Sequence, residues 1–596
     1  MTDRTGPIMK LREGGALDLR SAIVGCMPAL VGVGLFSAVI NVLGLTGSVY
    51  MLQVYDRVLP SQSVPTLVGF TIGMLGLYAV YGLLDFVRLR VLVRIGNRLH
   101  RNLQQKVFAL SLSLPLVAGA EAVRMQPLRD LDQLRGFLSG LGPTVVFDAP
   151  WIPFYLVVIY LLHPSLGVLA TVGAIGVVLL TVVAEFLARR PAARASEALL
   201  AQRTLAESGR RNAEVVHAMG LSVRIGQRWN EVIHAYLIHQ ERLSDIVGAA
   251  GSLSKALRMA LQSSVLGLGA YLVIGGEASP GVIIASSILL GRSLAPVDAA
   301  IANWRGFLAT RQSYSQLSAA LRNFGSKDKL MELPPPQAVL AVEELTVAPP
   351  GDLQKPTVLN VSFQLSRGAG MAILGPSGSG KTTLVRALVG VWKPLRGTVR
   401  LDGASLDQWD SERLGMHIGY LPQDVELFDG TVADNISRFG GKDDPKGVLA
   451  AARAAGIDKM IMRMPRGFQT RVGEGGMALA GGQRQLIGLA RALYGDPFLV
   501  VLDEPNSNLD VEGDVSLAGA ILSVRQRGGI VIIVAHRPSA LTNIDQVLVM
   551  SKGALHSFGS REDVLANVVR PFPPAAERSA SVVPLQKAVS AREVHF

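Results

Sequence analysis

A glycine-rich loop with a lysine and two threonines lies in the second half of the 596-residue chain. It reads, in order, Gly375, Pro376, Ser377, Gly378, Ser379, Gly380, Lys381, Thr382 and Thr383. An apolar run, 371–374, precedes the loop and predicts a strand, and a helix is expected after it. Glycines let backbone N–H groups close around phosphates, whose charge also suits a helix N-terminus. We expect Lys381 to reach the β- and γ-phosphates of a nucleotide and the Thr382 hydroxyl to ligate Mg²⁺.

Three further side chains follow predicted strands. The apolar run 498–502 ends in Asp503 and Glu504, and the run 530–534 is followed closely by His536. Asp503 suits the shell of a magnesium ion, and Glu504 suits a general base that polarises the attacking water. His536 is expected to contact the γ-phosphate, because ligands bind at the carboxyl ends of parallel strands. The alternatives are surface turn residues for the two acids and a structural role for the histidine.

The elements that position these residues form an α/β phosphate-loop domain. From residue 338 onward, short β-branched runs alternate with helical segments, which predicts a central sheet with helices over 338–568. Three consecutive prolines, 334–336, predict an extended linker over 326–337. The Ala-, Pro- and Ser-rich tail, 569–596, is predicted to be disordered.

The first half of the chain is far more apolar. Of all residues 49% are hydrophobic and only 17% are charged, which is typical of a protein with membrane spans. Runs long enough to cross a bilayer of about 30 Å lie at 24–54, 65–87, 144–162, 165–187, 248–275 and 280–303. The fold prediction is therefore a membrane α-helical bundle of six transmembrane helices over 21–325, after a short segment 1–20. His163 and Pro164 separate two of the runs and predict a tight hairpin.

The positive charges fall mainly between the apolar runs. The segments 88–142 and 187–247 are rich in lysine and arginine, whereas the short connections contain only Arg57. This asymmetry predicts that both long loops and both termini are cytoplasmic. The net charge of +12 then favours contact with anionic membrane lipid over nucleic acid. Both loops are also long enough to continue the spans as helices towards the phosphate-loop domain.

Two charged side chains interrupt the spans, where charge is costly. Asp148 lies near two prolines at the start of the third span, and Arg292 lies near the middle of the sixth. A polar translocation path and a structural ion pair remain open alternatives. The single cysteine, Cys26, excludes a disulfide framework within the chain, a zinc cluster and a cysteine-based redox pair. We expect Cys26 to be a small buried side chain.

Residues 338–565 resemble the nucleotide-binding domain of ATP-binding cassette (ABC) transporters. Gln423, in the run 420–424, matches the Q-loop of that family, and the run 507–510, which ends in Asp510, matches its D-loop. The signature motif corresponds to Leu479, Ala480, Gly481, Gly482 and Gln483. The resemblance implies that Gln423 serves catalysis and Mg²⁺ coordination. It also implies that Asp510 and residues 480–483 help to hold ATP in a head-to-tail homodimer, whose closure would drive alternating access.

The chain departs from the family pattern at two positions. Ala480 stands where the signature usually has serine, which removes one hydroxyl contact to the γ-phosphate. One neutral hydrogen bond contributes about 0.5–1.5 kcal/mol, so we predict slower or weaker closure and retained activity. The adenine-stacking aromatic is missing from the run 348–351, Ala-Pro-Pro-Gly, where adenine is expected to rest on a proline ring.

Several stretches resemble the ATPases of type I secretion systems that export proteases and lipases. They are Tyr55–Pro60, Phe147–Trp151, Gly291–Pro296 and Asn303–Arg305. Val472–Gly476, just before the signature, resembles the X-loop of ABC exporters, which contacts the coupling helix of the partner subunit. The resemblance implies an unfolded protein substrate with an uncleaved C-terminal signal. It also implies a periplasmic membrane-fusion adaptor, an outer-membrane channel and a place in the bacterial inner (plasma) membrane. We do not expect the chain to belong to the exporters with an N-terminal cysteine-peptidase domain, because few residues precede the first span.

Two alternatives share the motifs. One is an ABC exporter of lipids or small amphiphiles built on the same architecture. The other is an ATP-binding regulatory membrane protein with low turnover, against which Glu504 and His536 argue, because a protein that only binds ATP needs neither a base nor a γ-phosphate contact.

Overall fold

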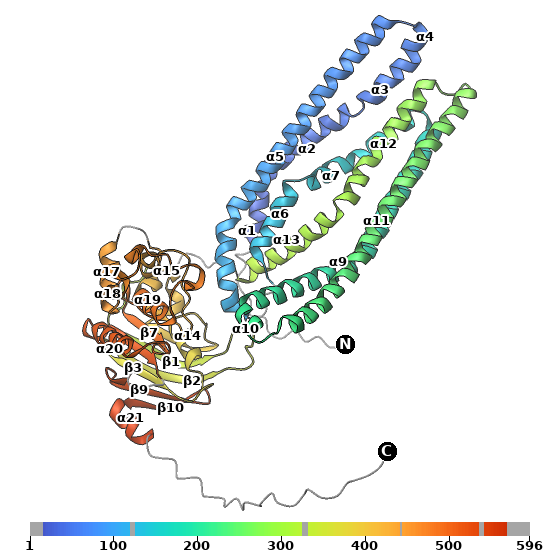
Figure 1. Ribbon diagram of the computed structural model, residues 1–596. Helices are drawn as coiled ribbons and strands as arrows, with labels where there is room; N and C mark the ends of the chain where they lie inside the picture. The colour runs from blue at the N-terminus through green and yellow to red at the C-terminus, as the bar shows by residue number, and fades with distance from the viewer. Residues whose placement is uncertain (1–15, 120–124, 325–331, 441–443, 536–540, 569–596) are drawn as a thin grey trace, which may run out of the picture. The chain divides into compact units, whose positions relative to one another are not determined.

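The computed structural model describes residues 16–119, 125–324, 332–440, 444–535 and 541–568 (Figure 1). Contacts divide the chain into two compact units, residues 1–326 and 327–596, which we describe separately. Most of the predicted N-terminal segment, half of the predicted linker, the predicted disordered tail and His536 lie outside the described residues.

Within the described part of the first unit, six helices are long and apolar enough to cross a membrane, as predicted. The first span comprises α2 (Met27–Leu43), α3 (Thr46–Gln53), a π-helical turn (Val54–Val58) and α4 (Leu59–Ser61). The others are α5 (Val64–Ala118), α7 with α8 (Gly142–Asp148 and Ile152–Leu162, joined by a 3₁₀ turn), α9 (Pro164–Arg211), α11 (Ser222–Ile274) and α12 (Pro280–Ala302). Shorter helices are α1 (Ala16–Val24), α6 (Pro127–Leu138) and α10 (Ala213–Ala218), and α13 (Trp304–Phe324) follows the last span.

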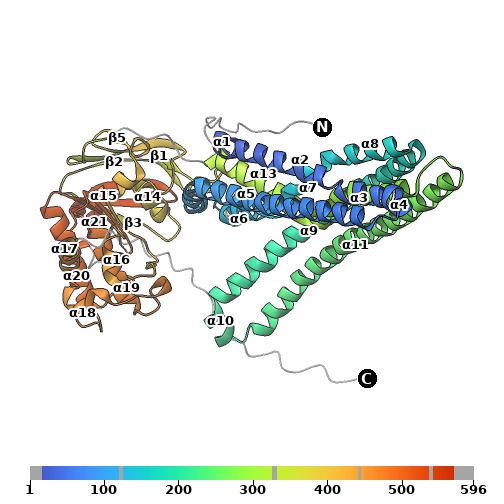
Figure 2. The same ribbon diagram turned by 90° about the horizontal axis from the view of Figure 1, so that it is seen from above.

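The helix ends follow from local sequence. Ser63 adopts an extended conformation and its hydroxyl accepts a hydrogen bond from the Thr66 N–H, so it caps α5. His163 is extended between α8 and α9, with φ −161° and ψ 129°, and Pro164 begins the next helix. The predicted tight hairpin is therefore present. The long helices α9 and α11 continue well beyond their apolar runs and are joined through α10 (Figure 2).

The spans pack on one another through small residues and expose apolar side chains outward. A Cβ atom on Gly173 of α9 would lie only 2.3 Å from Leu261 of α11, so glycine permits this close approach. Leu261 belongs to a buried cluster that joins α8, α9, α11 and α12. Leu161 and Ile274, by contrast, are 81% and 87% exposed. Such an outward apolar surface suits lipid tails.

The second unit contains a ten-stranded sheet in the order β5-β4-β1-β2-β10-β9-β3-β8-β7-β6. Its strands are β1 (Val339–Val347), β2 (Val358–Ser366), β3 (Gly370–Leu374), β4 (Arg396–Leu401), β5 (Ala404–Ser405), β6 (Ile418–Leu421), β7 (Leu499–Asp503), β8 (Ile530–Val534), β9 (Gln546–Ser551) and β10 (Ala554–Ser560). Strands β3, β8, β7 and β6 are parallel neighbours, whereas β1 pairs antiparallel with β2 and β4.

Helices cover both faces of the parallel strands. They are α14 (Lys381–Leu388), α15 (Ser411–His417), α16 (Val432–Ile436), α17 (Pro445–Ala454), α18 (Asp458–Met462), α19 (Gly481–Leu493), α20 (Val511–Gln526) and α21 (Arg561–Val568). Successive residues of a strand point to opposite faces. Val500 and Leu502 accordingly enter one hydrophobic cluster, and Leu499 and Val501 enter the other. A parallel sheet buried on both faces explains why its central strands read as continuous apolar runs.

Candidate nucleotide-binding site

The register of the parallel strands brings the predicted site residues to one edge of the sheet. Val534, the last residue of β8, pairs with Ile373 of β3 on one side and with Asp503 of β7 on the other. The phosphate loop, the two acids and the segment after β8 therefore leave the sheet together. His536 belongs to that last segment, outside the described residues, so its contact with the γ-phosphate stays a prediction.

The phosphate loop between β3 and α14 depends on glycine at defined positions. Gly375, Gly378 and Gly380 have φ values of 150°, 78° and 94°, which favour residues without a Cβ atom. A Cβ on Gly375 would lie 2.3 Å from the Met550 carbonyl oxygen, and one on Gly380 would lie 2.5 Å from that of Thr357. The loop is thus held tightly against the neighbouring backbone.

Lys381 begins α14 and turns its side chain back into the loop. Its Nζ donates hydrogen bonds to the carbonyl oxygens of Gly375 and Pro376, at 2.9 and 3.0 Å, and the residue is only 6% exposed. Burial lowers the pKa of the Lys381 ammonium, and the carboxylates of Glu504 and Asp503 oppose that shift. A phosphate entering the loop would offer this cation a stronger, charged acceptor.

Asp503 ends β7 as a fully buried acid, with 0% exposure. Neither carboxylate oxygen has a hydrogen-bond partner of normal geometry within the described residues. Burial raises the pKa of the Asp503 carboxyl, and the nearby Thr382 hydroxyl acts in the opposite direction. Two unsatisfied carboxylate oxygens beside a hydroxyl form an oxygen-only donor set, which is what Mg²⁺ prefers. Thr383 differs, because its hydroxyl lies 3.1 Å from that of Thr357 and is already partnered.

Glu504, the next residue, has a strained backbone and a fixed side chain. Its φ of 50° lies in the left-handed region, which costs a non-glycine residue roughly 1–2 kcal/mol. Its N–H donates to the Val534 carbonyl at 3.2 Å, and its carboxylate accepts a hydrogen bond from the Gln423 amide at 3.1 Å. Residues 81 positions apart therefore meet, as expected for a base and a Q-loop that serve one site.

The signature residues begin α19. Ala480 is the N-cap, and because alanine has no side-chain acceptor, it makes no capping bond. Its own N–H donates to the Gln483 side-chain oxygen at 3.1 Å. A Cβ on Gly482 would lie 3.0 Å from the Asn508 carbonyl oxygen, so glycine allows the D-loop to approach. Asp510 caps α20 by accepting a hydrogen bond from Gly513 at 2.8 Å.

The signature residues do not meet the phosphate loop within one chain. Among the described residues, no hydrogen bond joins positions 480–483 to the loop 375–383. The ATP contacts expected of Ala480, Gly481, Gly482, Gln483 and Asp510 therefore stay predictions. Pro349 and Pro350, expected beneath adenine, follow β1 and are partly buried.

Gln485, one turn into α19, was not predicted to belong to the site. This side chain is only 1% exposed, and its amide donates to the backbone oxygens of Glu504 and Pro505. These hydrogen bonds attach the signature helix to the turn that contains the candidate base. The available signal was a glutamine among the residues 485–493, where most other positions are apolar and buried.

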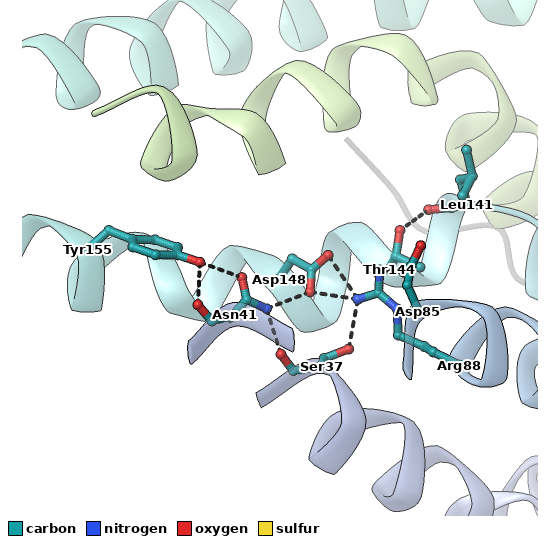
Figure 3. Close-up of polar contacts among 8 residues, drawn as sticks. All are labelled: Ser37, Asn41, Asp85, Arg88, Leu141, Thr144, Asp148 and Tyr155. Atoms are coloured by element: carbon teal, nitrogen blue, oxygen red, sulfur yellow. Dashed lines mark hydrogen bonds and ion pairs between the residues drawn. The ribbon is translucent and has the colours of Figure 1, made fainter. Parts of the chain in front are cut away.

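Asp148, the first of the two charged residues noted within the spans, belongs to a buried polar cluster of the membrane unit. Arg88 of α5 donates to both oxygens of Asp148, at 3.0 and 3.2 Å, and to Asp85 at 2.7 Å (Figure 3). Asn41 of α2 also donates to Asp148, at 2.9 Å, and accepts a hydrogen bond from Tyr155. Asp148 thus forms a structural ion pair with Arg88, within a polar cluster that joins three spans.

Arg292 makes no such ion pair with any described residue. Its guanidinium lies 5.8 Å from the centre of the Tyr81 ring, which is a cation–π contact between the sixth and second spans. The translocation path predicted for Arg292 remains an open alternative.

Comparisons with known proteins place the chain in a family. Residues 30–294 match the family described as ABC transporter transmembrane region, and residues 358–507 match the ABC transporter family. The chain is 49% identical, over 96% of its length and 99% of the relative, to the type I secretion system ATP-binding protein PrsD of Rhizobium meliloti (strain 1021).

More distant relatives agree. The leukotoxin translocation ATP-binding protein LktB of Mannheimia glucosida is 29% identical over 89% of this chain and 75% of the relative. The solved structure of a bacterial Atm1-family ABC exporter with ATP bound shares the fold, with a TM-score of 0.76 and 22% identity over 91% of this chain and 96% of that one. The chain belongs to the ABC transporters of type I secretion systems, multi-pass membrane proteins that couple ATP hydrolysis to export.

Proposed function

We propose that two copies of this chain form an inner-membrane exporter that hydrolyses ATP at two composite sites. Each site would pair the phosphate loop of one copy with the signature residues 480–483 of the other. The separation of these motifs within one chain supports the proposal, because the signature residues otherwise have no ligand to bind. A homodimer supplies two copies of each motif and therefore two complete sites.

The contact between Gln423 and Glu504, beside the buried Lys381, is the observation that carries the assignment of chemistry. Lys381 and the loop N–H groups would bind the β- and γ-phosphates. Thr382, Asp503 and Gln423 would hold Mg²⁺, which would supply positive charge beside the phosphates. Glu504 would accept a proton from the attacking water.

The cargo we propose is an unfolded protein with a C-terminal signal. Relatives named for leukotoxin translocation and cyclolysin secretion support it. A periplasmic adaptor and an outer-membrane channel would complete the path out of the cell. The excess of arginine in the segments 88–142 and 187–247 supports a cytoplasmic position for these loops and for the ATPase domain.

The test measures ATP hydrolysis by the full-length protein in nanodiscs, with and without peptides from the C-termini of candidate cargo proteins. Glu504→Gln should abolish turnover and retain ATP binding, while Glu512→Gln, the same change at an exposed position of α20, should leave both intact. Cargo peptides that change turnover of the unmodified protein would support protein export. Turnover equal to the Glu504→Gln background would overturn the assigned chemistry, and turnover that responds only to lipids would overturn the cargo.

A further inference from the structure

An apolar cavity lies in the membrane unit. Its volume is about 260 Å³, and its walls come from the start of the first span and from α5, α6 and α13. The walls are apolar and include Cys26, Leu30, Leu99 and Phe137. An enclosed apolar cavity of about 150 Å³ already holds a benzene molecule. The cavity therefore has room for a longer hydrocarbon segment.

One face of α13 forms one wall of the cavity. Phe307, Thr310, Arg311 and Tyr314 of α13 line it, at the spacing of residues that share one face of a helix. Thr310 is only 9% exposed, and its hydroxyl oxygen is buried with no hydrogen-bond partner among the described residues. This oxygen is closed off from the cavity, whose surface is almost entirely apolar.

The cavity opens beside a cation. Phe307 and Tyr314 are 38% and 40% exposed, so the walls reach the surface. Arg311 is exposed and makes no ion pair with the residues described. The indole ring of Trp304 lies 5.5 Å from Phe307, which adds an aromatic group of the type that gathers at membrane–water interfaces. An apolar cavity wall and an exposed cation therefore lie next to each other on α13.

We propose that this cavity binds one anionic phospholipid from the cytoplasmic leaflet. An acyl chain would fill the apolar interior, and the phosphate would pair with Arg311. The assignment to the cytoplasmic leaflet rests on the proposed function, in which the long loops are cytoplasmic. Because the walls come from elements next to three spans, a bound lipid would hold α2, α5 and α13 together where they leave the apolar region.

The experiment uses the full-length protein in nanodiscs that contain photoactivatable phosphatidylglycerol or the matching phosphatidylcholine. Peptides from α2 and α13 should carry roughly fivefold more phosphatidylglycerol, the ratio that corresponds to about 1 kcal/mol for one arginine near an anionic lipid surface. Arg311→Gln should reduce this ratio to about one. Arg322→Gln, the same change at an exposed position of α13, should preserve it.

A cavity-filling variant, Cys26→Phe, should remove the label of both lipids from these peptides. Equal labelling by the two lipids, or a ratio that Arg311→Gln leaves unchanged, would overturn the proposal. Adducts between two protein chains in place of lipid adducts would show that a partner subunit fills the cavity, which would also overturn it. If Cys26→Phe does not fold, the Arg311→Gln result decides. ATP hydrolysis measured on the same samples tests the proposed function separately.

Discussion

The side-chain amide of Gln423 donates a hydrogen bond of 3.1 Å to the carboxylate of Glu504. Gln423 follows β6, and Glu504 follows β7, its parallel neighbour in the sheet. The bond therefore orients the candidate base through a side chain from an adjacent loop. Movement of the Q-loop would break this bond or change the orientation of Glu504, which would link the conformation of the loop to hydrolysis.

Gln423→Ala should lower ATP turnover about 10- to 100-fold, the usual cost of losing a side chain that orients a metal-site residue. Because Gln423 is also a proposed metal ligand, the Mg²⁺ concentration that gives half-maximal turnover should rise. Steady-state ATPase assays across a magnesium titration measure both effects. Gln364→Ala, at an exposed position of β2, is the matched control. A turnover loss with unchanged magnesium dependence would remove Gln423 from the metal shell and leave it as an orienting residue.

Asp503→Asn should stabilise the nucleotide-free protein and weaken its response to ATP with Mg²⁺. Burial raises the pKa of this carboxyl above its ordinary value of 3.8, so the folded protein binds the proton more tightly than the unfolded chain does. The ionised carboxylate therefore costs stability above its folded-state pKa, and this cost disappears as the pH falls towards 3.8. The variant removes the charge and with it the cost.

Thermal unfolding of the full-length protein at several pH values checks this prediction. The unfolding temperature of Asp503→Asn should exceed that of the unmodified protein near neutral pH, and the difference should shrink in acid. Asp352→Asn, a change at an exposed acid, should show no such difference. A variant that is less stable at neutral pH would mean that Asp503 is held by contacts stronger than its burial cost.

The central part of the nucleotide-binding unit was predictable because its signals are local. The predicted strand 530–534 coincides with β8, and the predicted 498–502 differs from β7 by one residue at each end. Burial on both faces makes these strands continuously apolar. The glycines of the phosphate loop likewise predict positive φ values there. The six spans were predictable for a similar reason, since a bilayer demands long apolar runs.

Contacts between distant segments were not predictable. Nothing near Asp148 identifies Arg88 as its partner, because the pair forms only when α5 packs beside α7. Gln485 also looks like an ordinary polar helix residue until α19 is placed against the turn after β7. Periodicity shows that a residue is buried, whereas the partner it finds there depends on how whole elements pack.

The ion pair between Arg88 and Asp148 should respond unequally to loss of its two members. Asp148→Asn leaves Arg88 paired with Asp85, whereas Arg88→Met leaves both carboxylates without their cation. Removing one member of a buried pair costs about 3–5 kcal/mol, and we expect Arg88→Met to lie at the upper end of that range. The double variant should be more stable than Arg88→Met alone. Scanning fluorimetry in detergent measures the order, and strictly additive losses would show that the two side chains do not interact.

Ala480→Ser should raise ATP turnover. The added hydroxyl would restore a contact with the γ-phosphate across the proposed dimer, and one neutral hydrogen bond of about 0.5–1.5 kcal/mol corresponds to roughly two- to tenfold. Serine would also cap α19, which Ala480 cannot do, so a gain could have two causes. Ala480→Asp separates them, because aspartate caps the helix equally well but places a negative charge towards the phosphate. Turnover should rise for serine and fall for aspartate, while both variants unfold at a higher temperature. Equal gains in turnover would assign the effect to the helix cap and leave the composite site without this support.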